Sequence, residues 1–172
     1  MKDNTVLTPH FKLREFTESA TAMKQGIANV PPPEAVENLR RLCEHTLEPL
    51  RLKLQLPVVI TSGFRCQQLN EIIVHAARKS QHLTGQAADF YVAGIAGHPS
   101  TSSGTASHRE LLIKAFRLII TDESIDFDQL ILYPTFIHVS YVSKERNRHQ
   151  LTRASSNGAY TALSRADALA LS

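Results

Sequence analysis

The chain has 172 residues, the usual length of one domain, and 42% of them are hydrophobic, which is enough for a folded core. Its formal net charge of +3 is too small, and its basic residues too scattered, for a dedicated nucleic-acid binder. Two cysteines, Cys43 and Cys66, exclude a disulfide-rich scaffold and a four-cysteine zinc ribbon.

No stretch approaches the roughly 18 apolar residues that a membrane span needs. The N-terminal residues also lack the apolar run of a secretory signal. We therefore expect a protein that is cytoplasmic as synthesised, or that leaves by a route without a cleaved signal, such as release to the cell wall by lysis. A monomer is the expected oligomeric state.

The first predicted element is a helix that begins at residues 30–33, because proline is tolerated in the first helical turn. Apolar residues then recur every three or four positions as far as Leu54, which indicates one buried helical face. Pro49 interrupts this pattern, so we expect a kink or a break there. A short strand is predicted at 57–61 and a further helix at 66–79.

The second half of the chain predicts two strand regions around one helix. Residues 87–92 are typical of a strand, and residues 94–107, rich in Gly and small polar side chains, predict a loop. Ser107 and Glu110 fit a capping box at the start of the next helix. Two strands near 127–132 and 136–142 are close enough to form an antiparallel hairpin.

Helices and short strands without a repeated βαβ rhythm favour an α+β fold, a small antiparallel sheet flanked by helices. From about Arg148 the chain loses regular periodicity and is rich in Ser, Ala and Thr. We therefore predict one domain over residues 1–147 and a tail or peripheral segment over residues 148–172.

The most informative segment for chemistry is residues 80–89, SQHLTGQAAD. Gly85 allows a backbone conformation that is closed to other residues. Strand alternation then places Asp89 on a face that small alanines leave uncrowded. In the later strand, His138 shares a face with Phe136 and Ser140.

If the two strands are neighbours, His82, Asp89 and His138 can meet. Two neutral imidazoles and one carboxylate suit zinc, and three protein ligands leave a fourth position open, as in catalytic sites. The alternative is that each residue is structural, since a lone His in a strand is usually a satisfied packing residue. The other histidines have no comparable setting, and we interpret them as surface or structural residues: His10, His45, His75, His98, His108 and His149.

Residues 80–89 match the S-x-H-x-x-G-x-A-x-D signature of zinc D-alanyl-D-alanine carboxypeptidases and related peptidoglycan peptidases, a group that includes phage endolysins. The chain resembles this family over most of its length. Residues 10–16 resemble its N-terminal segment, residues 61–65 (TSGFR) its S-G-[YF]-R motif, and residues 127–131 with 136–141 its C-terminal hairpin. The same zinc fold occurs in the hedgehog N-terminal domain.

The resemblance implies roles for individual residues. It makes His82, Asp89 and His138 the ligands of one Zn²⁺, whose bound water attacks a peptide bond in a peptidoglycan stem peptide. It makes Arg65 the residue that binds a substrate carboxylate or the oxyanion. Ser80 is expected to support the loop by hydrogen bonding at the substrate site rather than to act as a nucleophile.

The sequence departs from the family at the general base. The acidic residue common three positions before the last zinc histidine is Thr135 here, and Tyr133 stands nearest to where other relatives carry Glu. Asp128 is our substitute as the base, with Asp126 and Glu123 as weaker candidates. Tyr133 is interpreted as a donor to substrate or oxyanion.

This missing base keeps other hypotheses open. The domain could bind zinc and a cell-wall peptide with weak catalysis or none. Zinc could instead be structural, holding two strands and a loop together. Catalysis by Cys66, whose pKa the adjacent Arg65 could lower, is the weakest alternative, because no histidine is placed in sequence to form a dyad.

Overall fold

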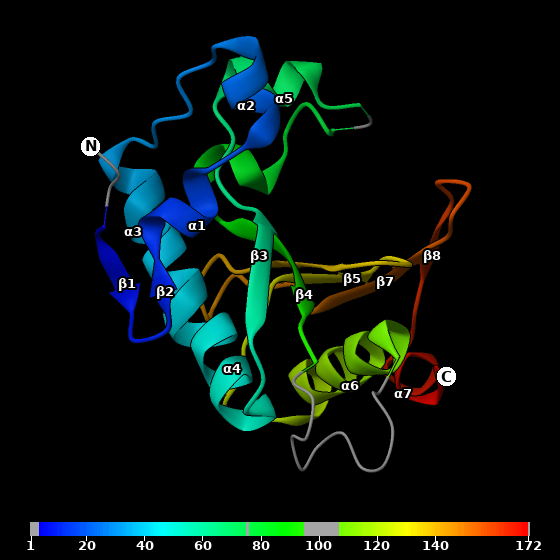
Figure 1. Cartoon of the computed structure of the whole chain (residues 1–172). Coiled ribbons are helices and arrows are strands. Elements are labelled where there is room, and N and C mark those ends of the chain that lie inside the picture. Colours follow the sequence, from blue (N-terminus) through cyan, green and yellow to red (C-terminus); the bar gives the residue numbers. More distant parts are fainter. Residues whose placement is uncertain (1–3, 75, 95–106, 172) are drawn as a thin grey trace.

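The computed structural model describes residues 4–74, 76–94 and 107–171, and its centre is a six-stranded sheet (Figure 1). Neighbouring strands are antiparallel except for the parallel pair β5 and β7. The α+β class predicted from the sequence is confirmed. In spatial order the strands are β3 (Val58–Ser62), β4 (Ala87–Val92), β6 (Ile137–Ser140), β5 (Gln129–Leu132), β7 (Gln150–Ala154) and β8 (Tyr160–Ala162).

Short helices surround this sheet, with α2 and α5 at its upper end and α6 and α7 below it in Figure 1. A separate two-stranded hairpin lies near the N-terminus, formed by β1 (Val6–Thr8) and β2 (Phe11–Lys12). The α-helices are α1 (Leu13–Thr17), α2 (Ala20–Gln25), α3 (Pro33–Leu42), α4 (Glu48–Leu54), α5 (Gln67–Ile72), α6 (His108–Thr121) and α7 (Arg165–Ala170).

The predicted interruption at Pro49 is present as a π-helical turn, Cys43–Leu47, between α3 and α4. Proline has no N–H with which to reach the carbonyl of His45 four residues earlier. The backbone N–H of Asp126 donates to that carbonyl instead, at 3.0 Å. The break in the helix thus ties it to the segment that leads into β5.

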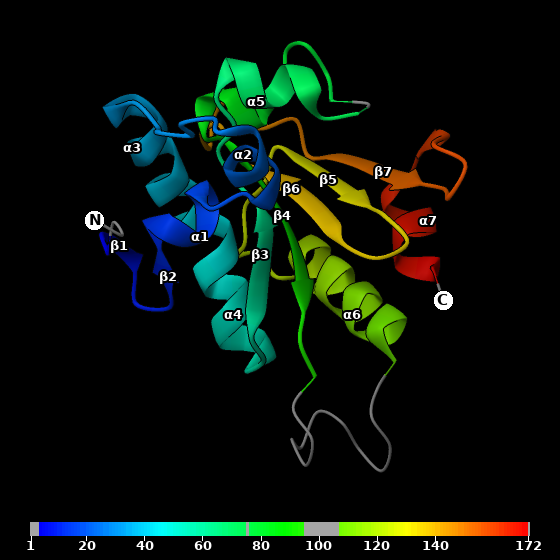
Figure 2. The same ribbon diagram turned by 45° about the horizontal axis from the view of Figure 1, so that its top comes forward.

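One face of the sheet is apolar and covered by helices. Along β4, Ala88, Phe90 and Val92 are buried in the main core with residues of α4 and α6, whereas Asp89 and Tyr91 alternate onto the opposite face. Figure 2 shows α4 beside β3 and α6 beside β4. The opposite face, away from this helical layer, carries polar side chains such as Asp89.

The hairpin of β5 and β6 and the strand at 87–92 are confirmed, and Ser107 with Glu110 forms the predicted capping box of α6. The helix predicted at 66–79 is shorter: α5 ends at Ile72, ahead of the turns that lead to Ser80. Most of the loop predicted at 94–107 lies outside the described residues.

The C-terminal segment is not a tail. β7 pairs in parallel with β5 and places Leu151 in the core, β8 adds the edge strand, and Ala168 of α7 is fully buried. The expected boundary at residue 147 therefore falls inside a continuous sheet. Short strands at a sheet edge have too few apolar positions for a clear period, which is why periodicity did not indicate them.

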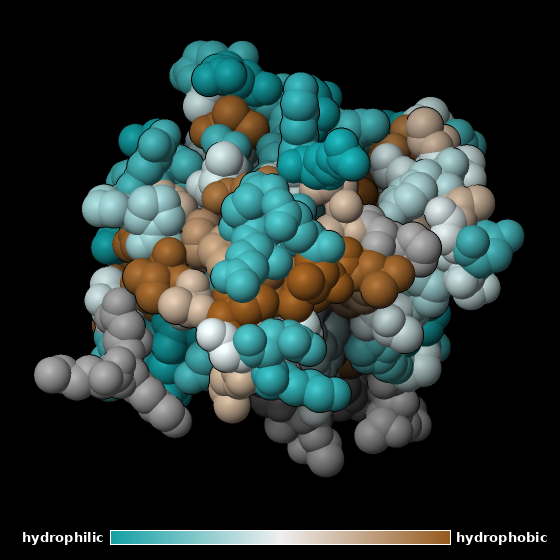
Figure 3. Space-filling model, turned by 90° about the horizontal axis from the view of Figure 1, so that it is seen from above, coloured by the Kyte–Doolittle hydropathy of each residue, from teal (hydrophilic) through white to brown (hydrophobic). Residues whose placement is uncertain are grey.

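The side that carries α2 and α5 shows a band of apolar surface among hydrophilic residues (Figure 3). Large exposed apolar side chains of this part of the chain include Met23, Ile72 and Val74.

Among the described residues, no helix has the length and apolar character needed to span a bilayer.

Leu151→Ala tests whether the C-terminal strands belong to the core. Leu151 is 8% exposed, so its truncation should lower the free energy of unfolding by about 2–3 kcal/mol, as removing a buried leucine does. Urea unfolding measures this change. Leu52→Ala is the matched control, because Leu52 is 58% exposed and its truncation should cost less than about 0.5 kcal/mol. Equal losses in the two variants would contradict the assignment.

Candidate metal centre

Two of the three predicted ligands are brought together by strand pairing. β4 and β6 are antiparallel, and their register places Asp89 directly opposite His138. Residues directly opposite in such a pair have Cβ atoms about 5 Å apart and point to the same face. The pairing therefore places these two side chains within contact distance, although 49 positions separate them in the chain.

His82 reaches the same point from a short 3₁₀ turn, Gln81–Thr84, which precedes β4. The Ser80 hydroxyl caps this turn by accepting from the N–H of His82, at 3.3 Å, so Ser80 supports the loop as expected. Gly85 ends the turn with φ of +70°. A Cβ at Gly85 would lie 2.4 Å from the carbonyl oxygen of Ala35, so both backbone conformation and space require glycine there.

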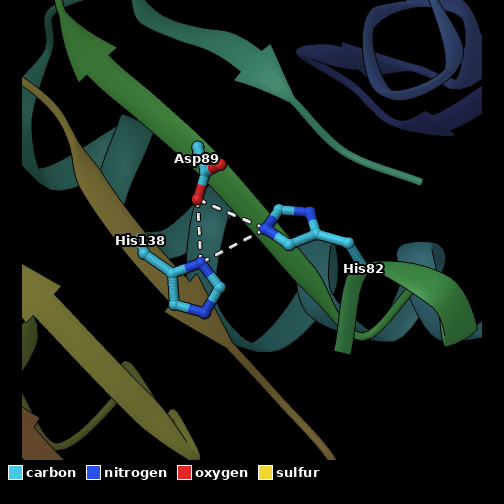
Figure 4. A group of neighbouring side chains, drawn as sticks. All are labelled: His82, Asp89 and His138. Atoms are coloured by element: carbon cyan, nitrogen blue, oxygen red, sulfur yellow. Dashed lines mark hydrogen bonds and ion pairs between the residues drawn. The ribbon is translucent and has the colours of Figure 1, made fainter. Parts of the chain in front are cut away.

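The three side chains point toward one another (Figure 4). His138 Nδ1 lies 2.8 Å from Asp89 Oδ1, and His82 Nε2 lies 3.3 Å from that oxygen and 3.3 Å from His138 Nδ1. His82 is 2% exposed, whereas the side chain of His138 is 13% exposed. The cluster thus has one deeply buried imidazole and one that is slightly exposed.

A backbone carbonyl fixes the tautomer of His82. Its Nδ1 lies 2.6 Å from the carbonyl oxygen of Gly63, which can only accept, so Nδ1 carries the proton. Nε2 is then left with a lone pair aimed at Asp89 and His138. Gly63 is itself in tight contact, since a Cβ there would lie 2.6 Å from Phe16. Gly63 belongs to the TSGFR motif, but the sequence did not predict that its carbonyl orients His82.

The electrostatics favour a neutral His82 beside a charged Asp89. Burial lowers the pKa of His82, and the nearby Asp89 only partly opposes this effect. Burial would raise the pKa of Asp89, but the attraction of His82 and the hydrogen bond with His138 outweigh it and hold that pKa well below its usual range. At neutral pH His82 is therefore neutral and Asp89 is charged, the forms in which these two groups coordinate a cation.

The spacing of these donor atoms suits a tetrahedral ion. Ligands about 2.0 Å from a tetrahedral zinc ion lie about 3.3 Å apart, close to the separations between His82 and its two partners. His82, Asp89 and His138 form the metal-binding candidate among the described residues. Two imidazole nitrogens and one carboxylate oxygen are a typical zinc set with one position left for water or substrate.

Arg65 contacts the cluster through Asp89. Its Nη2 donates to Asp89 Oδ2 at 3.1 Å, and its Nε donates to the Ser62 hydroxyl at 3.1 Å. Arg65 therefore holds the carboxylate oxygen that does not face the imidazoles. The structure places the predicted arginine at the site, with Asp89 as its partner.

Tyr133 forms an aromatic wall with two other rings. It stacks on Phe136 with ring centroids 4.2 Å apart, and its hydroxyl lies 2.9 Å from the hydroxyl of Tyr160 on β8. Burial and this neighbouring phenol raise the pKa of Tyr133, and the charges of Asp89 and Arg65 act on it as well. Tyr133 is therefore a protonated donor near the cluster. Tyr160 was missed because it lies beyond the boundary expected at residue 147.

Asp128 does not have the environment of a general base. Asp128 is only 1% exposed. Its Oδ1 accepts a hydrogen bond from Arg148 Nε, and its Oδ2 accepts from Arg148 Nη2 and Gln81 Nε2. Burial opposes ionisation, but these donors lower the pKa of Asp128 to about 2, far below that of an effective base near neutral pH. Asp128 lies just before β5, and the residue of that strand that pairs with His138 is Ile131.

The remaining described histidines pair elsewhere. His10 bonds to the buried Glu48, His45 stacks on Tyr141, His108 bonds to the carbonyl of Thr135, and His149 pairs with Asp126. His75 and His98 lie outside the described residues. Both cysteines are free thiols, and burial raises the pKa of Cys43.

The comparison with protein families agrees with this geometry. Residues 9–113 match the family described as Peptidase M15. The matched region contains His82, Asp89 and Arg65, and it ends before the β5–β6 hairpin that carries His138. No curated protein matches the chain.

Gly85→Ala should destabilise the protein strongly because a Cβ would meet the Ala35 carbonyl. Gly26→Ala is a matched control, since Gly26 has φ of +64° but no atom within 4 Å of the position that a Cβ would take. We expect a loss of about 1 kcal/mol for Gly26→Ala and at least twice that for Gly85→Ala in urea unfolding. Similar losses would show that the contact with Ala35 is unimportant.

Asp128→Asn should lower the free energy of unfolding at pH 7 by about 2 kcal/mol, because the folded-state pKa of about 2 lies below the unfolded value of about 3.9. This stabilisation is present in full above about pH 4 and is lost as the pH falls toward 2. The gap between wild type and variant should therefore close over that range in urea titrations. A gap that is constant from pH 7 to pH 3 would contradict the ionised role of Asp128.

Proposed function

The chain belongs to the peptidase M15 family, whose members are generally zinc-dependent, and we propose that it hydrolyses a peptide bond in peptidoglycan stem peptides. The observation that carries this proposal is the convergence of His82, Asp89 and His138 with donor atoms within 4.8 Å of one another. Either a D-Ala-D-Ala carboxypeptidase or an endolysin-type endopeptidase fits this site.

In this proposal His82 binds zinc through Nε2, His138 through Nδ1 and Asp89 through Oδ1, the atoms that face one another. A zinc ion held there would make a water nucleophilic near neutral pH and polarise the substrate carbonyl. Because His138 is partly exposed, a peptide can approach the cluster from the side of this residue.

Two residues would act on the substrate. Arg65 keeps a permanent positive charge beside the cluster, where it favours the developing oxyanion or a substrate carboxylate. Tyr133, with its raised pKa, keeps its phenolic proton and can donate it in a hydrogen bond to the substrate. Ser80 contributes through the turn that it caps rather than by direct attack.

One observation favours a second candidate function. Among the described residues, Asp89 is the one carboxylate bonded to His82 or His138, and Asp128 is fully engaged elsewhere. A metallopeptidase of this kind normally uses a carboxylate to take a proton from water. A zinc-dependent module that binds cell-wall peptide with weak or no turnover is therefore the alternative.

The test combines zinc binding with cleavage. The zinc-loaded protein is incubated with purified peptidoglycan and stem peptides, and released fragments are identified by mass spectrometry. We expect metal-dependent fragments from the wild type and a loss of at least about 100-fold in rate for His138→Ala, because one of three ligands is removed.

His108→Ala is the control, since His108 bonds to the Thr135 carbonyl and not to the cluster. It should cleave like the wild type. Tight zinc binding without fragments from any wall preparation would favour the binding module. A wild type that binds no zinc would overturn both functions.

A further inference from the structure

A buried carboxylate joins the two segments that carry the histidines of the cluster. Asp128 accepts five hydrogen bonds: from Arg148 through its backbone N–H, Nε and Nη2, from Gln81 Nε2 and from the Ser140 hydroxyl. Gln81 directly precedes His82, and Ser140 lies two residues after His138 on β6. The same carboxylate thus contacts both sides of the candidate metal site.

The contact toward His82 passes through one side chain. Gln81 Nε2 donates to Asp128 Oδ2 at 2.9 Å, and Gln81 Oε1 accepts from Arg148 Nη2 at 3.4 Å. Both ends of this amide are therefore held. Because Gln81 is the first residue of the 3₁₀ turn that carries His82, its anchoring limits rotation of that turn.

The contact toward His138 passes through Ser140, which is fully buried. The backbone N–H of Asp128 donates to the Ser140 carbonyl at 2.7 Å, and the Ser140 hydroxyl donates to Asp128 Oδ2 at 3.3 Å. The same hydroxyl accepts from the N–H of Gln129 at 3.1 Å. These bonds fix the end of β6 against the start of β5.

Arg148 makes this arrangement possible. A buried carboxylate is costly unless a charge and hydrogen bonds compensate it. Arg148 supplies both, with Nε 2.8 Å from Oδ1 and Nη2 2.5 Å from Oδ2, a two-pronged contact. It comes from the C-terminal segment beyond the residues matched by the family.

We infer that Asp128, locked by Arg148, is a positioning residue that sets His82 and His138 at the separation required to share one metal ion. The inference rests on the proposed function. It gives Asp128 the role of orienting the two histidines rather than of transferring a proton. Partners that orient ligands typically change metal affinity by about 10–100-fold when they are lost. If Asp128 served packing alone, the loss of its contacts would lower the stability of the protein and leave the metal affinity unchanged.

Gln81→Ala is the sharpest test, because it cuts the contact to the His82 turn and leaves the Asp128–Arg148 pair intact. The dissociation constant of Zn²⁺ is measured on the full chain by competition with a chromophoric chelator, and unfolding of the metal-free protein is measured in urea. We expect Gln81→Ala to weaken zinc binding about tenfold and to shift the visible absorption bands of the Co²⁺-loaded protein.

Arg148→Gln should have the same effect on zinc, and Arg148→Lys, which keeps the charge but not the two-pronged contact, should lie between it and the wild type. Gln86→Ala is the matched control: Gln86 bonds to Thr84 within the same loop and has no bond to Asp128, so its zinc affinity should equal that of the wild type.

Variants that lose stability in urea but keep the wild-type zinc affinity and Co²⁺ spectrum would overturn the positioning role and leave the proposed function standing. A wild type that binds no zinc would overturn the proposed function and this inference together.

Discussion

The candidate site depends first on the antiparallel register of β4 and β6, which places Asp89 opposite His138. A shift of one residue would turn one of the two side chains to the apolar face, because strand residues alternate. Residues such as Phe90 and Ile137, fully buried on that face, make such a shift costly. The hydrophobic core therefore determines where the polar cluster forms.

His82 depends on a different constraint, which is close backbone packing. The Gly63 carbonyl sets the tautomer of His82, and Gly85 lets the turn that carries His82 approach Ala35 of α3. Both glycines lie where a side chain would collide with neighbouring backbone. The two glycines are thus required by close packing of the backbone as well as by the chemistry of the site. The packing of the chain itself brings the three candidate ligands together.

The C-terminal segment adds support that the strands of the hairpin alone would lack. β7 extends the sheet next to β5, and Arg148 just before it compensates the buried Asp128. In this arrangement a carboxylate expected to transfer protons holds two segments together instead. In the proposed function, Arg65 and Tyr133 act on the substrate beside the three metal ligands.

The sequence by itself predicted the α+β class and the β5–β6 hairpin, because strand alternation and turn signals are local properties of the chain. Its S-x-H-x-x-G-x-A-x-D pattern and its resemblance to a zinc peptidase family indicated the candidate ligands, whereas the pairing of β4 with β6 brought Asp89 to His138. The sequence also located the helix break at Pro49, since proline acts on its own turn. Only the tertiary structure decided the role of Asp128 and the place of the C-terminal strands. Those depend on Arg148 and Leu151 meeting residues far away in the chain, and no local periodicity encodes such contacts.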